Sequence, residues 1–152
     1  EIYRKLIGGR LAPVLETLKH LDRKKVHLEI TNLVVPGYTD DPEMVKRMSG
    51  WILKNLGPNH PLHFSRFHPM YKLDRLAPTP VSTLDRFRTL AMAEGIRYVY
   101  IGNVPGHEGC HTFCHNCKKK IIHRDGFTVR DFRIKNGTCP FCGTKIPGVF
   151  PA

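Results

Sequence analysis

The spacing of apolar residues changes several times between residues 1 and 106. Residues 1–25 repeat leucine and valine at helical spacing after a Gly8-Gly9 break, whereas residues 26–33 alternate, with Leu28 and Ile30 toward one face. The two patterns then recur twice. We therefore expect helices over residues 1–25, 42–56 and 80–94, and strands over residues 26–33, 62–67 and 98–101.

The two later helices have clear start and stop signals. Asp41 can cap the first of them, Pro42 suits its first position, and Gly57-Pro58 ends it. Gly95 ends the other. We expect the first to bury a stripe of Met44, Met48, Ile52 and Leu56, and the second a stripe of Val81, Leu84, Phe87 and Ala91.

This alternation of helices and strands predicts an α/β fold with parallel strands and right-handed helical crossovers. Three such strands do not close a barrel, so we expect half of a parallel (β/α) barrel, with the polar strand faces lining its interior. Function in such folds gathers at the carboxyl ends of the strands. The loops of interest are therefore residues 36–41, 68–76 and 103–110.

Residues 107–152 are organised by two cysteine pairs. Each pair is a C-x-x-C turn, and four thiolates presented in this way form a near-tetrahedral site that suits zinc or a single iron. Asp125-Gly126 and Asn136-Gly137 predict hairpin turns between the pairs. We expect a zinc-ribbon or rubredoxin-like module with four cysteine ligands, and the alternative is two disulfides. The expected metal ligands are Cys114, Cys117, Cys139 and Cys142.

A fifth cysteine precedes the first pair. Cys110, Cys114 and Cys117 have the C-x-x-x-C-x-x-C spacing with which radical S-adenosylmethionine (SAM) enzymes hold a 4Fe-4S cluster. However, Asn116 stands where that motif usually has an aromatic residue, and the downstream pair completes a four-sulfur site. We therefore favour the mononuclear site, with Cys110 as a spare thiol or substitute ligand. We expect the nearby histidines to be solvated loop residues: His107, His111 and His115.

The net charge of +11 is spread along the chain. Residues 107–152 hold eight Lys or Arg against three acids, and the rest of the chain has sixteen against ten. The basic residues 118–120 could contact phosphates. We instead expect a solvated basic face, or a surface that meets other parts of a larger protein, and no nucleic-acid partner. The module's aromatic residues are expected to form its small core: Phe113, Phe127, Phe132 and Phe141.

Several segments together resemble a known family. Residues 34–41 are similar to the V-V-P-G-x-x-D segment after the fifth strand of pyruvate formate-lyase activating enzymes, and residues 65–70 to their L-P-Y-H-x-M segment on the sixth. Four segments resemble the AmmeMemoRadiSam-system radical SAM family more closely: residues 3–10, 63–69, 102–109 and 139–148. The resemblance covers essentially the whole chain.

The resemblance implies that residues 1–106 are the C-terminal half of a radical SAM partial barrel and that residues 107–152 are a four-cysteine metal-binding ribbon. The family's cluster ligands lie on N-terminal strands that this sequence lacks, so the missing N-terminal half is the expected partner. Thr31 stands where activating enzymes often carry an arginine, and Arg66 could supply the charge for the methionyl carboxylate. The residues placed at SAM by resemblance are Thr31, Leu33, Arg66, Phe67 and His68.

The implied reaction is cleavage of SAM by a 4Fe-4S cluster, which gives a 5′-deoxyadenosyl radical. The full-length parent would be the enzyme, with a protein as its expected substrate, and this chain alone would be inactive. The alternatives are a zinc-ribbon module that binds nucleic acid or protein, and a rubredoxin-like electron carrier. The sequence has no membrane-spanning apolar run, and we expect a cytoplasmic protein with no membrane partner.

Overall fold

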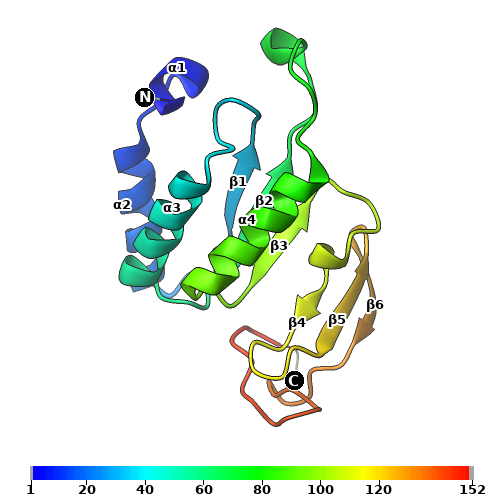
Figure 1. Cartoon of the computed structure of the whole chain (residues 1–152). Coiled ribbons are helices and arrows are strands. Elements are labelled where there is room, and N and C mark those ends of the chain that lie inside the picture. The colour runs from blue at the N-terminus through cyan, green and yellow to red at the C-terminus, as the bar shows by residue number, and fades with distance from the viewer. Residues whose placement is uncertain (1, 151–152) are drawn as a thin grey trace.

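The computed structural model describes residues 2–150 as two three-stranded sheets with helices beside the first (Figure 1). The first sheet and its helices come first along the chain: α1 (Ile2–Ile7), α2 (Leu11–Arg23), β1 (Ile30–Val34), α3 (Pro42–Asn55), β2 (Leu62–Arg66), η1 (Tyr71–Leu73), α4 (Val81–Glu94) and β3 (Val99–Gly102). The second sheet follows: η2 (Glu108–Cys110), β4 (Thr112–Phe113), β5 (Lys120–Asp125) and β6 (Thr128–Phe132).

The first sheet is parallel and has the order β1-β2-β3. Leu62 of β2 lies opposite Ile30 of β1 and Val99 of β3. Helices α3 and α4 connect successive strands and pack against each other on one side of the sheet (Figure 1). The predicted parallel α/β arrangement is therefore confirmed. Within residues 2–150 the sheet stays open and forms no closed barrel.

The core lies between this sheet and its two helices. Leu62 and Phe64 of β2 are fully buried, and the Phe64 ring meets Phe87 of α4 edge to face at 5.6 Å between centroids. In α3 the buried residues are Val45, Ser49 and Ile52, whereas the predicted residues Met44, Met48 and Leu56 are only partly buried against the core. The predicted stripe is thus confirmed fully at Ile52 and partly at its other three positions. It missed Val45 and Ser49, and the small polar Ser49 is one that an apolar pattern does not reveal.

Two predicted boundaries also change. The first helix is interrupted at Gly8-Gly9, as expected, and α2 has no buried residue. The first strand begins at Ile30 rather than Val26, where the Ile30 N–H donates to the carbonyl of Pro61. Backbone pairing with β2 starts only there. The alternation from residue 26 therefore extends beyond the paired strand, although Leu28 is still buried.

The second sheet belongs to what we call the cysteine module (residues 107–150). Its strands β4-β5-β6 are antiparallel. Residues 126–127 link β5 to β6 where a turn was predicted. The second predicted turn also forms, because Asn136 and Gly137 both have positive φ, 50° and 69°, between the bridged residues Lys135 and Thr138. Positive φ at both central positions is the type I′ geometry that Asn-Gly favours.

The predicted aromatic core of the cysteine module is wrong. Phe127 is fully exposed at the hairpin turn, and Phe132 and Phe141 are 44% and 42% exposed. The buried cluster instead contains Tyr98 from the end of the first unit and six residues of the module: Cys114, Ile121, Ile122, Ile134, Cys139 and Ile146. Two cysteines, four isoleucines and the Tyr98 ring fill the centre, whereas Phe113 is only half-buried and the other three predicted rings lie outside.

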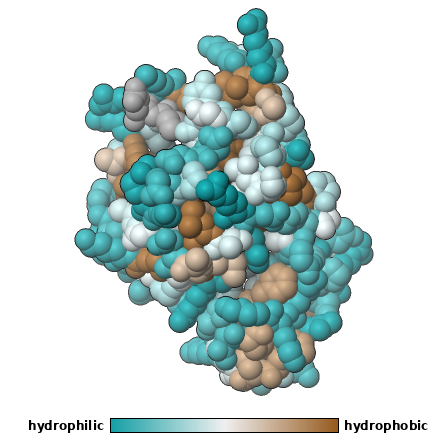
Figure 2. Space-filling view, in the orientation of Figure 1, coloured by the Kyte–Doolittle hydropathy of each residue, from teal (hydrophilic) through white to brown (hydrophobic). Residues whose placement is uncertain are grey.

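The surface mixes apolar and polar side chains. On the face shown in Figure 2, hydrophobic residues are scattered among hydrophilic ones over both sheets' regions. No helix within residues 2–150 has the length and apolar character needed to cross a membrane.

Candidate metal centre and the open sheet face

The four paired cysteines form one cluster. Their Sγ atoms all lie within 4.8 Å of one another, and the 114–142 and 117–139 distances are both 3.7 Å. A tetrahedral ion with metal–sulfur bonds near 2.3 Å requires sulfur–sulfur distances of about 3.8 Å. The cluster therefore fits a tetrahedral zinc or iron. These distances are far longer than a disulfide bond, so the two-disulfide alternative is wrong.

The two C-x-x-C turns have the same backbone hydrogen bonds. In the first, Cys114 N donates to Lys119 O and Lys118 N donates to Cys114 O. In the second, Cys139 N donates to Thr144 O and Gly143 N donates to Cys139 O. Lys118 and Gly143 hold equivalent positions and both have positive φ, 61° and 71°. The two C-x-x-C turns therefore have the same local backbone structure, and each contributes two thiols to the cluster.

The thiols differ in acidity. Hydrogen bonds from the Thr144 hydroxyl and backbone lower the pKa of Cys142 to about 5. A hydrogen bond from the Lys119 backbone acts to lower the pKa of Cys117, but burial and the neighbouring thiols outweigh it and raise this pKa to about 11. Asn116 Nδ2 also donates to Cys142 Sγ, at 3.8 Å. The hydrogen bonds from Thr144 therefore make Cys142 more readily ionised than Cys117.

Cys110 lies outside this cluster. Its Sγ atom is 3.2 Å from Nδ1 of His111 and 3.7 Å from the carbonyl of Arg124. The thiols of Cys114 and Cys117 lie with the downstream pair, so the structure does not assemble the C-x-x-x-C-x-x-C site. Cys110 is accordingly a spare thiol rather than a fourth or fifth ligand in this arrangement.

The three histidines beside the first pair are not solvated loop residues. His111 is buried, and His107 and His115 are half-buried. His107 Nδ1 accepts the Gly109 N–H, and His115 Nδ1 lies 2.9 Å from the hydroxyl of Tyr98. Their prediction as solvated failed because β4 and η2 pack against β3, a contact between segments that the local sequence does not specify.

The face of the parallel sheet away from α3 and α4 is polar and open. This open face carries the alternate residues of the three strands: Thr31, Leu33, His63, Ser65, Tyr100 and Gly102. Thr31 lies opposite His63, which in turn lies opposite Tyr100. Thr31 and Leu33 are exposed, and none of the six is among the buried residues. It corresponds to the polar strand faces that the sequence predicted.

A polar network crosses this open face toward the cysteine module. His63 Nε2 is 2.7 Å from Glu29, and the His63 ring stacks on Tyr100 at 4.9 Å between centroids. The Tyr100 hydroxyl is 2.9 Å from Thr112 Oγ1, to which Arg124 Nη1 donates at 2.7 Å. Burial acts to raise the pKa of Glu29, but its hydrogen bonds to His27 and His63 outweigh burial and lower it.

The five residues expected at SAM do not all share one surface. Thr31 and Leu33 lie on the open face, whereas Arg66 has the opposite strand parity, and its Nε donates to Thr79 O at 2.9 Å. Phe67 is buried, while His68 is exposed, with Nε2 3.5 Å from Asn103 O. Leu33, Arg66, Phe67 and His68 lie at or beyond the carboxyl ends of two adjacent strands, on different sides of the sheet, whereas Thr31 lies near the start of β1.

One residue that joins these strand ends was missed. Thr79 is completely buried; its hydroxyl accepts the Phe67 N–H at 3.0 Å and donates to the carbonyl of Val34. It therefore fixes the ends of β1 and β2 to the segment that enters α4. Its position directly before Pro80, at the start of a predicted helix, is the local signal that could have identified it.

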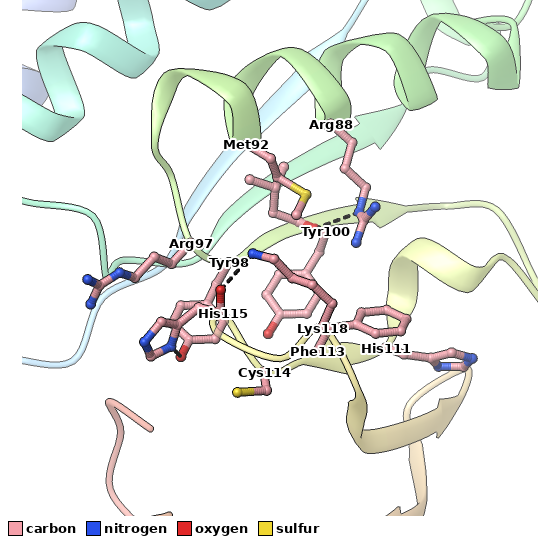
Figure 3. A pocket seen from close by; sticks show the side chains of 11 residues that line it. Arg88, Met92, Arg97, Tyr98, Tyr100, His111, Phe113, Cys114, His115 and Lys118 are labelled. Atoms are coloured by element: carbon pink, nitrogen blue, oxygen red, sulfur yellow. Dashed lines mark hydrogen bonds between the residues drawn. The ribbon is translucent and has the colours of Figure 1, made fainter. Parts of the chain in front are cut away.

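The two sheets meet at a narrow seam between α4, β3 and the cysteine module. A cavity of about 20 Å³ there is lined by Met92, Tyr100 and Phe113, among others (Figure 3). That volume accommodates about one water molecule. Beside it, Arg88 Nε donates to Val99 O at 3.0 Å, and its guanidinium lies 5.8 Å from the Phe113 ring centroid. A larger and more open hollow of about 320 Å³ lies beside this cavity, lined by Asp85, His107 and Lys118, among others, so the seam is only partly filled.

Comparison with known proteins gives a partial match. No family model matches the chain. An uncharacterized protein of Methanocaldococcus jannaschii is 44% identical over 148 residues, which cover 96% of this chain and 44% of that protein. The pyruvate formate-lyase 1-activating enzymes of Escherichia coli K12 and Shigella flexneri are 26% identical over 111 residues, covering 66% of this chain and 45% of each enzyme.

The chain therefore spans less than half the length of the curated relatives it matches. The similarity to an activating enzyme is distant and partial, and it suggests a relationship to the radical SAM enzymes.

Proposed function

We propose that this chain is part of a radical SAM enzyme related to pyruvate formate-lyase activating enzymes. In this proposal the open face of β1–β3 is a segment of the inner barrel wall, and the cysteine module is a metal-stabilised unit beside it. The observation that carries the proposal is the polar open face of a helix-covered parallel sheet, within a chain similar to an activating enzyme over 111 residues.

The SAM contacts are assigned to the open face of β1 and the end of β2. Thr31 and Leu33 offer a hydroxyl and an apolar surface on the open face, and His68 is exposed beyond β2. Arg66 lies on the helix side of β2 with its Nε on Thr79 O, so we leave it out of the proposed SAM contacts. Buried Phe67 would then position the backbone rather than contact the ligand.

A second half of the barrel is the proposed partner. β1 is an edge strand of the parallel sheet, and an unpaired edge readily takes another strand. Next in sequence to it, α2 has no buried residue and exposes Leu11 and Val14. The missing N-terminal half would pair with β1 and cover this helix, and a protein substrate would enter the completed barrel.

This chain alone should not cleave SAM. The parent reaction requires a 4Fe-4S cluster, and the C-x-x-x-C-x-x-C spacing cannot supply one while Cys114 and Cys117 are committed to the four-thiol site. We assign zinc to that site. Its role would be structural, because all four positions of a tetrahedral ion are then taken by protein sulfur.

Two measurements on the purified chain test this proposal. Amide resonances of Thr31 and Leu33 should shift on titration with SAM, and Leu33→Arg should abolish the shifts, whereas Val129→Arg on exposed β6 should leave them unchanged. No shift at millimolar SAM, or shifts insensitive to Leu33→Arg, would refute SAM binding at the open face.

Metal analysis of protein purified without added metal tests the cysteine module. We expect about one zinc per chain, no acid-labile sulfide, and no 5′-deoxyadenosine after treatment with iron, sulfide and reductant. One iron without sulfide would instead indicate a rubredoxin-like electron carrier. Iron with sulfide and 5′-deoxyadenosine formation would show that Cys110 joins a cluster.

One observation favours a second function, nucleic-acid binding. Phe127, Phe132 and Phe141 of the cysteine module are exposed. Lys119 Nζ and the Arg133 guanidinium lie 4.9 and 6.0 Å from the Phe141 ring centroid. Exposed rings beside cations suit stacking on single-stranded bases. Binding of a single-stranded oligonucleotide that weakens steeply with salt, and is lost in Phe141→Ala, would support this function over a purely structural module.

A further inference from the structure

We propose that the hollow between α4 and the cysteine module binds a small aromatic anion, that is, a carboxylate or phosphate group carried on a planar ring. The hollow has a volume of about 320 Å³. Small-molecule pockets typically measure roughly 300–1,000 Å³. The hollow shares no residue with the open face, so this inference goes beyond the proposed SAM function and does not depend on it.

Segments that are distant in sequence form the walls of the hollow. Helix α4 contributes Asp85, Arg88 and Met92, and the cysteine module contributes η2 together with Phe113 and Lys118. Arg88 and Met92 lie across from the two module residues (Figure 3). The hollow is therefore built where two packed units meet, and no single surface loop forms it.

Both carboxylates of the hollow already have partners within the protein. His107 Nδ1 accepts the Gly109 N–H, so its proton lies on Nε2, which is 3.3 Å from Asp85 Oδ1. This contact joins the start of η2 to α4. Glu108 is paired with Lys120, at 2.9 Å. The carboxylates thus hold the walls in place.

The two cations that line the hollow have no carboxylate partner among the described residues. Arg88 donates from Nε to Val99 O at 3.0 Å, which leaves its two terminal amino groups for a ligand. Lys118 Nζ donates once, to His115 O at 2.6 Å, and an ammonium group has three donors. With Lys120 included, three cations face the two carboxylates. The unused donors and the positive balance favour an oxyanion.

An aromatic ring and a thioether supply apolar contact surface beside these cations. Phe113 and Met92 are both only partly buried, and both line the hollow. The Arg88 guanidinium lies 5.8 Å from the Phe113 ring centroid. A planar ring can stack on Phe113 and contact the Met92 sulfur while its oxyanion meets Arg88 and Lys118. Binding should therefore require both the ring and the charge.

The test uses the zinc-loaded chain and three naphthalene probes: 1-naphthyl phosphate, 1-naphthoate and the neutral 1-naphthalenemethanol. We expect the two anions to shift the NMR signals of the Met92 methyl group and the Phe113 ring, with dissociation constants of about 1 mM or lower. The neutral probe and inorganic phosphate should each bind at least about tenfold more weakly. Tighter binding of the phosphate would indicate a phosphorylated ligand, and tighter binding of naphthoate an aromatic carboxylic acid.

Two variants test whether the cations of the hollow select the anion. Lys118→Met keeps the length of an exposed side chain and removes its charge, so it should weaken both anionic probes about tenfold. Arg88→Gln should weaken them by at least as much. Lys119→Met is the matched control, because Lys119 lies beside Phe141 and does not line the hollow, and it should change affinity by less than about twofold.

Four results would overturn the proposal. The first is no saturable shift with either anionic probe up to about 5 mM. The second is a neutral probe that binds as tightly as the anions, and the third is inorganic phosphate that binds as tightly as 1-naphthyl phosphate. The fourth is equal weakening by Lys118→Met and Lys119→Met, which would show general attraction to a basic surface. This last comparison decides the question even if Arg88→Gln fails to fold.

Discussion

The two sheets of this protein are held together in different ways. The parallel sheet buries large side chains, among them Phe64 and Phe87, between its strands and two helices. The cysteine module has no helix longer than a single 3-10 turn among its described residues, and its buried cluster is mostly isoleucine and cysteine. A core that small rarely supports a fold unaided. We infer that apolar burial stabilises the first unit and that a metal ion stabilises the second.

Removing the metal should have the largest effect and should separate the two units. Structural zinc sites contribute about 10–16 kcal/mol of apparent binding energy, far more than the small core of the module can replace. A strong chelator, or Cys139→Ser, should abolish hydrogen-exchange protection in β5 and β6 while that in β1–β3 remains. Cys110→Ser is the matched control and should keep both. Loss of hydrogen-exchange protection in both sheets together would contradict the inference that the metal stabilises only the cysteine module.

Phe64→Ala tests the other unit, because it weakens the apolar core of the parallel sheet and leaves the cysteine module intact. Phe64 is fully buried and packs on Phe87, so its truncation should lower the free energy of unfolding of the parallel sheet by about 3–5 kcal/mol. Phe127→Ala, in the fully exposed hairpin turn, should change it by less than about 0.5 kcal/mol. Urea denaturation followed by circular dichroism measures both. An equal loss from the two substitutions would be incompatible with the described core.

A smaller effect is expected from Thr79→Val. The substitution keeps the shape of the side chain but leaves the Phe67 N–H and the Val34 carbonyl without their partner, so it should cost about 1–3 kcal/mol. Thr128→Val on exposed β6 is the control and should be nearly neutral. Because Thr79 joins the ends of β1 and β2, the loss should appear in urea denaturation of the parallel sheet and leave zinc content unchanged.

Acid should release the metal from the cysteine module. A thiol whose folded pKa is depressed stays ionised until the pH falls through that value, so Cys142 should keep its metal bond down to about pH 5. Thr144→Val removes the hydroxyl that lowers this pKa, and the zinc should then leave at a higher pH. A zinc-sensitive dye can follow release against pH. An unchanged release curve would show that the hydroxyl does not set the acidity of Cys142.

The smallest expected difference lies between the two C-x-x-C turns. Gly143→Ala places a side chain at φ 71°, which should cost about 1 kcal/mol although no atom obstructs the new methyl group. At the equivalent position, Lys118 already has a Cβ atom at positive φ. Lys118→Ala adds no new backbone strain and should reduce zinc affinity less. Zinc affinity by competition measures both. Equal losses of zinc affinity would mean that adding a Cβ atom at positive φ does not account for the effect of Gly143→Ala.

Local patterns in the sequence predicted much of this molecule correctly. The order of helices and strands, the two faces of β2, and the cap of α3, where the Asp41 side chain accepts the N–H groups of Glu43 and Met44, all follow from residues close in sequence. The four clustered cysteines also follow from spacing, because a C-x-x-C turn places two thiols on one side whatever surrounds it.

Contacts between distant segments decided the rest. Exposure of Phe127, burial of Ser49, and the thiol–imidazole pair of Cys110 and His111 each depend on which element packs against which. Hydrophobicity states that a side chain favours burial, but not whether a neighbouring element has room for it. Periodicity and spacing are properties of one segment, whereas a core position or a hydrogen-bonded base requires a partner that only the folded chain brings close.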